Sequence, residues 1–453
     1  EDQLLNLVRE FPGDLAETII CLAVGDTVAP ARPRQASTPP LSSSTNNRRV
    51  FKVESDEELR RIMEAPAAEW MVFLHASQRE AVERSYKGPQ KITGGAGTGK
   101  TVVAMHRAQR LAAAGQAVLL TTFSRPLAQN IERSLTQLCS PEVRQRITVG
   151  TLKDIAGDCL QRTGADVQPA SDQDLRQFLA RAYQEESEGF RAKYPLAFIL
   201  SEYQQVIINA GPDDWRAYRD LHRVGRGRPL KNSDRKALWT LFEHARRFLR
   251  ARKRADWGEI YAIATKSLEI GEIDNRFDAI IVDEVQDLTT AQLRFVKQLA
   301  SDTPEQLMLI GDTGQRIYPG GFSLARLGIE TRGRSRILRV NYRTTEQIRR
   351  VAHQVVGKAV DDMEGGEEAR PRSISLTSGP QPNLVACNSR QREMKVALDR
   401  VRGWLSKNTE PRSIGIISPS DQVLGHIEEV FRNNRIRYQR LTGESSLEDI
   451  ILL

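Results

Sequence analysis

The segment that most constrains the fold is "ITGGAGTGKT", residues 92–101. It matches the G-x-x-x-x-G-K-T phosphate-binding loop without a mismatch, and it stands between an apolar entry and the helical run VVAMHRAQRLAAA. Glycines let backbone N–H groups wrap phosphates, and a following helix adds its positive end. A chance glycine-rich turn is the alternative, which the fixed Gly-Lys-Thr ending disfavours. We expect a nucleoside triphosphate to be held by Gly94, Gly95, Ala96, Gly97, Thr98, Gly99, Lys100 and Thr101.

Apolar runs that look like strands recur along the chain. They include AVLLTTFS, FDAIIVD and LMLIGD, and a second alternation of strands and helices starts near Arg336 with RILRV, SIGIIS and DIILL. Strands alternating with helices indicate an α/β fold with a parallel sheet covered on both faces.

Residues 151–265 are helical in pattern and rich in positive charge. In KALWTLFEHARRFLR (236–250), apolar residues recur at three and four, which predicts a buried face, with Arg246, Arg247 and Arg250 pointing elsewhere. Residues 216–254 hold eleven Arg and three Lys against three acidic residues, a local charge of +11 in a chain of net charge +8. This excess indicates a polyanion site, and a solvated helical face is the alternative.

Composition excludes several classes of protein. No window approaches the ~18 apolar residues of a membrane span, and no signal pattern opens the sequence, so we expect a cytoplasmic protein without membrane contact. The cysteines Cys21, Cys139, Cys159 and Cys387 lack paired spacing, which predicts reduced, mostly buried thiols. Residues 1–48 are expected to be an N-terminal helical segment and a disordered, Pro/Ser-rich linker.

A second chemical motif is "FDAIIVDEVQD", an apolar strand that delivers two carboxylates at its end. Asp283 is placed to join Thr101 in holding Mg²⁺, and Glu284 to orient and deprotonate the attacking water. Buried strands often end in polar residues that have no chemical role. Two adjacent carboxylates after a phosphate loop favour chemistry.

Four motifs in order, GGAGTGKT, DEVQD, IGDTGQRIY and VNYRTT, resemble the superfamily 1 DNA helicases of the UvrD/Rep type, from about Phe73 to Tyr438. The resemblance implies two RecA-like P-loop domains with parallel sheets plus an inserted helical subdomain. The first motor domain would comprise 49–150 with 266–334, the insert 151–265, and the second motor domain 335–453. It also implies ATP and Mg²⁺ as cofactors, with ATP bound between the motor domains.

The resemblance assigns roles to further residues. Gln78 is similar to the adenine-reading glutamine, and Gln286 to the residue that links the nucleotide and nucleic-acid sites. Val102 departs from relatives with an arginine there. The catalytic set implied is Lys100, Asp283, Glu284, the γ-phosphate sensor Gln315 and the arginine finger Arg343, with Tyr342 stacking on adenine.

Two further segments, 119–131 and 149–160, resemble those that lie along single-stranded DNA. Phe123 as plain core and Thr151 as a helix cap are the alternatives, and Lys153 stands where relatives often have histidine. Contacts to phosphate carry no sequence information, so binding should be non-specific and salt-dependent. The expected DNA contacts are Thr122, Phe123, Ser124, Arg125, Thr151, Arg316 and Tyr318, with Arg223, Arg226, Arg228 and Lys231 of the insert.

The family pattern continues with a Thr-x-His-x-x-Lys-Gly-Leu-Glu segment and an arginine finger segment that do not occur here, and the chain starts at Glu1. We therefore expect a fragment of a longer protein, with an incomplete second motor domain and weak ATPase activity. The leading hypothesis is an ATP-dependent helicase or translocase of single-stranded or partly duplex DNA, with 3′-to-5′ polarity by resemblance. The alternatives are a nucleotide-gated DNA-binding regulator and a P-loop enzyme such as a kinase.

Overall fold

A computed structural model describes residues 76–212, 214–221, 230–300, 306–315, 322–356, 373–375, 377–418, 420–440 and 450–452, with 359–361, 367–369 and the single positions 19, 74, 303 and 363. The expected segment and linker at 1–48 therefore lie outside the described residues. The chain divides into two compact units, residues 1–380 and 381–453.

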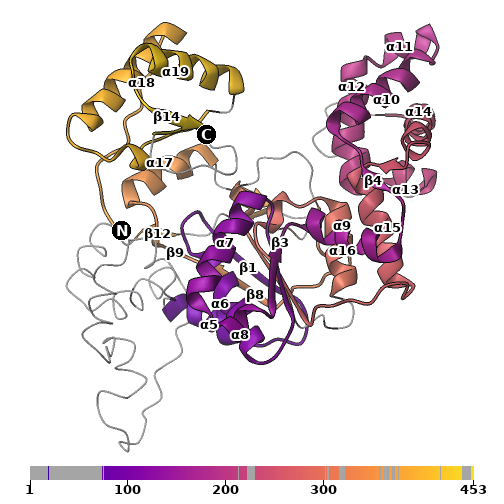
Figure 1. The fold of residues 1–453 in the computed structure, drawn as a ribbon, viewed down its shortest axis with the longest axis horizontal. Helices are drawn as coiled ribbons and strands as arrows, with labels where there is room; N and C mark the ends of the chain where they lie inside the picture. The colour runs from indigo at the N-terminus through magenta and orange to yellow at the C-terminus, as the bar shows by residue number, and fades with distance from the viewer. Residues whose placement is uncertain are drawn as a thin grey trace, which may run out of the picture. The chain divides into compact units, whose positions relative to one another are not determined.

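The first unit is built on a parallel sheet of six strands in the order β3-β2-β6-β7-β1-β8 (Figure 1). This confirms the predicted α/β class. The order places β1, which leads into the phosphate loop, beside β7 and β8. The strands are β1 (Gln90–Gly94), β2 (Val118–Thr121), β3 (Ile147–Gly150), β6 (Ala279–Val282), β7 (Leu307–Gly311) and β8 (Ser335–Leu338).

Both faces of this sheet are covered, because successive strand residues point to opposite sides. Leu120 and Ile281 pack in one apolar cluster together with residues of α5 and α6, while Leu119 and Ile280 pack in another with α9, α15 and α16. Figure 1 shows helices on either side of the strands. The covering helices are α5 (Ala76–Glu83), α6 (Lys100–Ala113), α7 (Arg125–Leu138), α8 (Pro141–Arg144), α9 (Leu152–Thr163), α15 (Trp257–Glu269) and α16 (Thr290–Leu299).

The helical insert has its own core, centred on Tyr203, Tyr218 and Phe242. Its elements are α10 (Asp172–Gln184), α11 (Glu188–Lys193), α12 (Leu196–Glu202), the π-helix η2 (Tyr203–Ile208), α13 (Trp215–Asp220) and α14 (Asn232–Arg250). The short parallel pair of β4 (Gln168–Pro169) and β5 (Arg254–Ala255) joins the two ends of the insert.

The apolar face predicted for α14 is confirmed, since Leu238, Leu241, Phe242, Ala245 and Leu249 are buried. The prediction that Arg246 points away from the buried face is wrong. Its guanidinium is buried against Asp256, with Nε 3.1 Å from the carboxylate, and Tyr203 donates to the same carboxylate at 2.6 Å. A buried arginine is stabilised by such a charged partner.

Some helices and strands pack in a different part of the molecule from the domain to which the sequence assigned them. α9 and the first nine residues of α15, which we assigned to the insert, pack in the core of the first sheet. β8, which we assigned to the second motor domain, pairs with β1, so the first sheet continues past residue 334. A strand is placed by its neighbours in the sheet, which a break in sequence pattern does not reveal.

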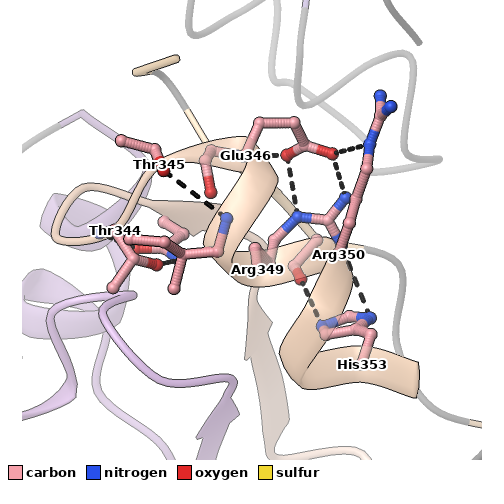
Figure 2. Close-up of polar contacts among 10 residues, drawn as sticks. Thr344, Thr345, Glu346, Arg349, Arg350 and His353 are labelled. Atoms are coloured by element: carbon pink, nitrogen blue, oxygen red, sulfur yellow. Dashed lines mark hydrogen bonds and ion pairs between the residues drawn. The ribbon is translucent and has the colours of Figure 1, made fainter. Parts of the chain in front are cut away.

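After β8 the chain forms β9 (Val340–Asn341), α17 (Glu346–Val356), the antiparallel pair β10 (Ala359–Asp361) and β11 (Glu367–Ala369), and β12 (Ile374–Ser375), which is parallel to β9. The buried Glu346 opens α17 and accepts hydrogen bonds from Arg349, Arg350 and the backbone N–H of Ser375 (Figure 2). The bond from Ser375 joins the start of this helix to β12.

The second unit contains a parallel sheet in the order β13-β15-β14 and two helices. Met394, Val401, Leu424 and Phe431 form its core between the helices and the sheet. The elements are α18 (Arg390–Leu405), β13 (Gly415–Ile416), α19 (Asp421–Asn433), β14 (Tyr438–Arg440) and β15 (Ile450–Leu452).

Two predictions from composition can be compared with the described residues. Among the described residues, none of the helices combines the length with the apolar composition that a membrane span requires. Cys139, Cys159 and Cys387 are free thiols; Cys159 is buried, whereas Cys139 and Cys387 are only half-buried. Cys21 lies outside the described part of the chain.

Candidate nucleotide site and nucleic-acid surface

The phosphate loop leaves β1 and enters α6 at Lys100, as the motif predicts. Gly97 and Gly99 both have positive φ, 78° and 79°, which residues with a side chain rarely adopt. The Lys100 ammonium donates to the carbonyls of Gly94 at 2.9 Å and Gly95 at 3.2 Å, so it lies over the loop. The loop therefore places backbone N–H groups, a helix N-terminus and a cation around one point, an arrangement suited to phosphate.

Gln78 lies directly against this loop. Its side-chain amide donates to the Thr98 carbonyl at 2.9 Å, and a Cβ at Gly99 would come within 2.0 Å of the same amide nitrogen. The structure thus brings the predicted adenine-reading residue to the loop, from the first turns of α5.

Thr101 and Asp283 meet at the predicted metal site. The Thr101 hydroxyl donates to Asp283 Oδ2 at 2.7 Å, although the two residues come from α6 and the end of β6. Asp283 is fully buried, and its Oδ1 has no hydrogen-bond partner among the described residues. Burial, together with the neighbouring Glu284 charge, raises the pKa of Asp283 to about 6.

These oxygens fit a magnesium ion. Mg²⁺ is commonly held by one or two protein oxygens plus water and substrate phosphates. The described residues contain no cluster of three His, Cys, Asp or Glu side chains that would indicate another kind of metal centre. A hydroxyl beside a buried carboxylate with an unpartnered oxygen, next to a phosphate loop, suits the ion that accompanies a triphosphate.

Glu284 adopts an unusual backbone conformation immediately after the strand. Its φ of 55° and ψ of 44° lie in the left-handed region, which costs a non-glycine residue about 1–2 kcal/mol. Such strain concentrates at functional sites. The turn allows the chain to enter the short helix η3 (Val285–Asp287) directly after the two carboxylates.

Gln286 connects this turn to the end of the neighbouring strand β7. Its amide nitrogen donates to Glu284 Oε2 at 2.6 Å, and its amide oxygen accepts the Asp312 backbone N–H at 2.9 Å. Asp312 in turn accepts a hydrogen bond from the Gln315 amide at 2.7 Å. The candidate base and the candidate γ-phosphate sensor are therefore joined through Gln286 and Asp312.

The segment "NYRT" packs on the loop from the other direction. Tyr342 donates its backbone N–H to the Gly97 carbonyl at 2.9 Å. Asn341 shapes the turn, because its side-chain oxygen accepts the backbone N–H groups of Arg343 at 2.9 Å and Thr344 at 3.1 Å. The structure thus brings Tyr342 and the exposed Arg343 beside the phosphate loop.

The predicted nucleic-acid residues lie at the carboxyl ends of β2 and β3. Thr122 is buried, and its hydroxyl has no partner among the described residues, whereas Phe123 is exposed on 39% of its surface. Ser124 caps α7. Arg125 is exposed and paired with Asp154 at 2.8 Å, and that hydrogen bond raises the pKa of Arg125.

Thr151 is largely buried and caps α9, where it exchanges hydrogen bonds with Asp154, as the alternative interpretation expected. Its contact with DNA stays a prediction. Lys153 lies 5.1 Å from the centre of the Trp257 ring. Arg223, Arg226, Arg228, Arg316 and Tyr318 fall outside the described residues, and Lys231 is exposed.

Sequence reasoning missed Asn341, Asp312 and Arg107. Asn341 and Asp312 act through short local hydrogen bonds, and an Asn or Asp at the end of a strand is the available signal for such turns. Arg107 is a buried cation of α6, whose other buried residues apart from Lys100 are apolar. The signal available in the sequence is its spacing of seven residues from Lys100, which places both side chains on the same face of the helix.

Comparisons with known proteins agree with this geometry. The profile of the UvrD/REP helicase N-terminal domain matches residues 74–330. Similar proteins are YjcD of Bacillus subtilis (27% identity over 396 residues, 83% of this chain and 50% of that protein), the ATP-dependent DNA helicase UvrD2 of Mycobacterium tuberculosis (24% over 412 residues, 82% and 55%) and the ATP-dependent DNA helicase PcrA of Staphylococcus epidermidis (21% over 397 residues, 82% and 51%).

The chain spans about half the length of these relatives. The matched region begins at α5 and ends before β8, so it includes the phosphate loop, both carboxylates and the Asp312–Gln315 turn. More than half of the chain fits the profile, and the contacts above join the motifs that define it. The chain belongs to the UvrD/REP helicase family.

Proposed function

We propose that this chain is the ATP-hydrolysing part of a DNA motor. It would bind ATP and Mg²⁺ at residues 94–101 and move along single-stranded DNA with 3′-to-5′ polarity, opening duplex ahead of it. The observation that carries the proposal is the pair of Thr101 and Asp283, whose side chains meet 2.7 Å apart beside the phosphate loop.

Each residue has a part in the proposed reaction. Phosphate oxygens would replace the Gly94 and Gly95 carbonyls as partners of Lys100. Thr101 and Asp283 would hold Mg²⁺, which offsets negative charge on the phosphates. Glu284 would take a proton from the attacking water, while Gln315 and Arg343 would contact the γ-phosphate and stabilise its charge in the transition state.

The contacts of Gln286 support a link between hydrolysis and DNA. A change at Glu284 during the reaction would alter its hydrogen bond with Gln286 and therefore the Asp312–Gln315 turn. In sequence, that turn leads directly to Arg316 and Tyr318, the predicted DNA contacts. We propose DNA that is single-stranded or partly duplex as the substrate, bound without sequence preference.

The test is ATP hydrolysis with and without single-stranded DNA, compared between the wild type and Glu284→Gln. We expect DNA to stimulate hydrolysis, and Glu284→Gln to lower kcat about 10²-fold or more with ATP affinity retained, since it removes the base and keeps the shape. Hydrolysis that is equal in both proteins and insensitive to DNA would refute the motor.

Strand displacement is the companion measurement. If DNA stimulates hydrolysis but labelled duplexes with a 3′ overhang are not opened, the chain translocates or binds without unwinding.

A further inference from the structure

Helix α5 is held at both of its ends. Its start is attached to the phosphate loop, and its last residues are attached to α6. Near its start, Gln78 donates to the Thr98 carbonyl of the loop at 2.9 Å. At its other end, two arginines of α6 contact the last carbonyls of the helix. The helix that carries the candidate base-reading residue therefore forms one piece with the helix that begins at Lys100.

The clamp at the end of α5 has a specific geometry. Arg107 Nη1 donates to the Val82 carbonyl at 2.7 Å and to the Arg84 carbonyl at 3.0 Å. Arg110 donates to the carbonyls of Val82, at 2.8 Å, and of Glu83. The last carbonyls of a helix lack intrahelical partners and carry partial negative charge, so cations stabilise them.

Arg107 is an unusual residue to find inside this core. Its side chain is 2% exposed, and it forms no ion pair among the described residues. Burial, followed by repulsion from Arg110, lowers the pKa of Arg107 to about 10. Packing alone would favour an apolar residue at this point, and Ala81 and Val82 of α5 already pack there with Ala104 and Ala108.

We propose that Arg107 is a positioning residue for recognition of the nucleotide base. By fixing the end of α5 on α6, it sets where Gln78 stands relative to the phosphate loop. This rests on the proposed function, in which Gln78 contacts adenine. Arg107 touches no nucleotide itself, and its effect reaches the base only through the position of α5.

The experiment separates the base from the phosphates. Isothermal titration measures the affinity of the chain for Mg²⁺-ATP, Mg²⁺-UTP and inorganic tripolyphosphate. We expect Arg107→Met to weaken ATP binding about tenfold and to leave tripolyphosphate and UTP within about twofold of the wild type. In a Gln78→Ala background, Arg107→Met should change ATP affinity little further, because residues that act through one another are not additive.

Arg162→Met is the matched control, since Arg162 also donates to a backbone carbonyl, that of Asp274, on another part of the unit. It should bind all three ligands like the wild type. Equal losses for ATP and tripolyphosphate in Arg107→Met would overturn the proposal, because the loop itself would then be damaged. Unchanged ATP affinity, or full additivity with Gln78→Ala, would overturn it too.

Two further outcomes are distinguishable. If the wild type does not prefer ATP to UTP and tripolyphosphate, base reading by Gln78 fails, and the proposed function is corrected at that residue. If Arg107→Met does not show the wild-type thermal unfolding, Arg107→Lys decides the matter. We expect Arg107→Lys to bind Mg²⁺-ATP about threefold more weakly than the wild type and to bind UTP and tripolyphosphate equally well. An unchanged affinity for ATP would contradict the proposed role of Arg107.

Discussion

Glu346 shows how one residue can hold a segment together. It is buried, yet burial does not neutralise it, because Arg349, the Ser375 backbone and Arg350 all donate to its carboxylate. Burial opposes the charge, but these bonds outweigh it and lower the pKa of Glu346 to about 2. The residue follows the turn that carries Arg343, so the carboxylate anchors α17 just after that turn (Figure 2).

We predict that Glu346→Gln lowers the free energy of unfolding at pH 7 by about 2–3 kcal/mol, since it removes the charge that pairs with buried Arg349. The folded pKa lies below the unfolded value, so the stabilisation is complete above about pH 4.5 and is lost as pH falls toward 2. Chemical denaturation of both proteins at pH 7 and near pH 3 measures the difference, which should shrink at the lower pH.

A surface carboxylate gives the control for that measurement. Glu393 pairs with Arg390 at 3.0 Å, and both side chains are half exposed. Glu393→Gln should change stability by less than about 1 kcal/mol at either pH. A difference for Glu346→Gln that did not vary with pH would show that the carboxylate is not charged in the folded protein.

At the scale of residues, the motifs indicated which side chains would lie near the phosphate loop, and the roles assigned to these side chains stay predictions. Gln78 and Lys100 both donate to carbonyls of the phosphate loop, and Thr101 donates to Asp283. Asn341 could not be assigned in the same way, because it acts by shaping a turn, and only the folded chain brings that turn against the phosphate loop. The contacts of a side chain across sequence distance are set by folding.

At the scale of elements, the junction between α14, η2 and α15 depends on one buried carboxylate. Asp256 accepts the Glu259 N–H, which caps α15, and also the Tyr203 hydroxyl and Arg246. One side chain therefore joins the insert to α15, a helix that packs on the first sheet. The apolar face of α14 followed from periodicity, but the burial of Arg246 did not, because its partner lies beyond the end of its own helix.

We predict that Asp256→Asn destabilises this junction by about 3 kcal/mol, because it leaves the Arg246 charge buried without its carboxylate. Hydrogen exchange should quicken in α14 and in the first turn of α15. Asp166→Asn removes the carboxylate of the exposed Lys253 pair and should leave exchange unchanged. Equal exchange in the Asp256 variant and the wild type would refute the role of the junction.

At the scale of the whole molecule, charge is distributed differently from what its count suggests. The segment 216–254 has a local charge of +11. Within the described residues, several of these cations form ion pairs with acidic side chains. A cation held in such a pair would be less available to the predicted DNA strand. The pairs are Arg219–Asp220, Arg246–Asp256, Arg250–Glu259, Lys253–Asp166 and Arg254–Asp174. A sequence reveals the number of charges, and only the fold reveals their pairing.

The prediction concerns salt dependence. Each phosphate contact contributes about −0.7 to the slope of log affinity against log salt for single strands. With several cations paired internally, we expect a slope of about −2 to −4 for an oligo-dT strand, and the same affinity for a strand of mixed sequence. Fluorescence anisotropy over a range of KCl measures both. A slope near −8 would mean that the internal pairs open on DNA.

Gly97 and Gly99 of the phosphate loop, and Gly311 at the end of β7, each lie against an amide side chain from a distant segment. A Cβ at Gly97, Gly99 or Gly311 would come within about 2 Å of an amide side chain from another motif: Asn341, Gln78 and Gln286, respectively. The space that a side chain at each glycine would need is therefore already filled by the amide. Across the relatives of this chain, the members of each pair should be exchanged together, so that a protein with a bulkier residue at the glycine also lacks the amide.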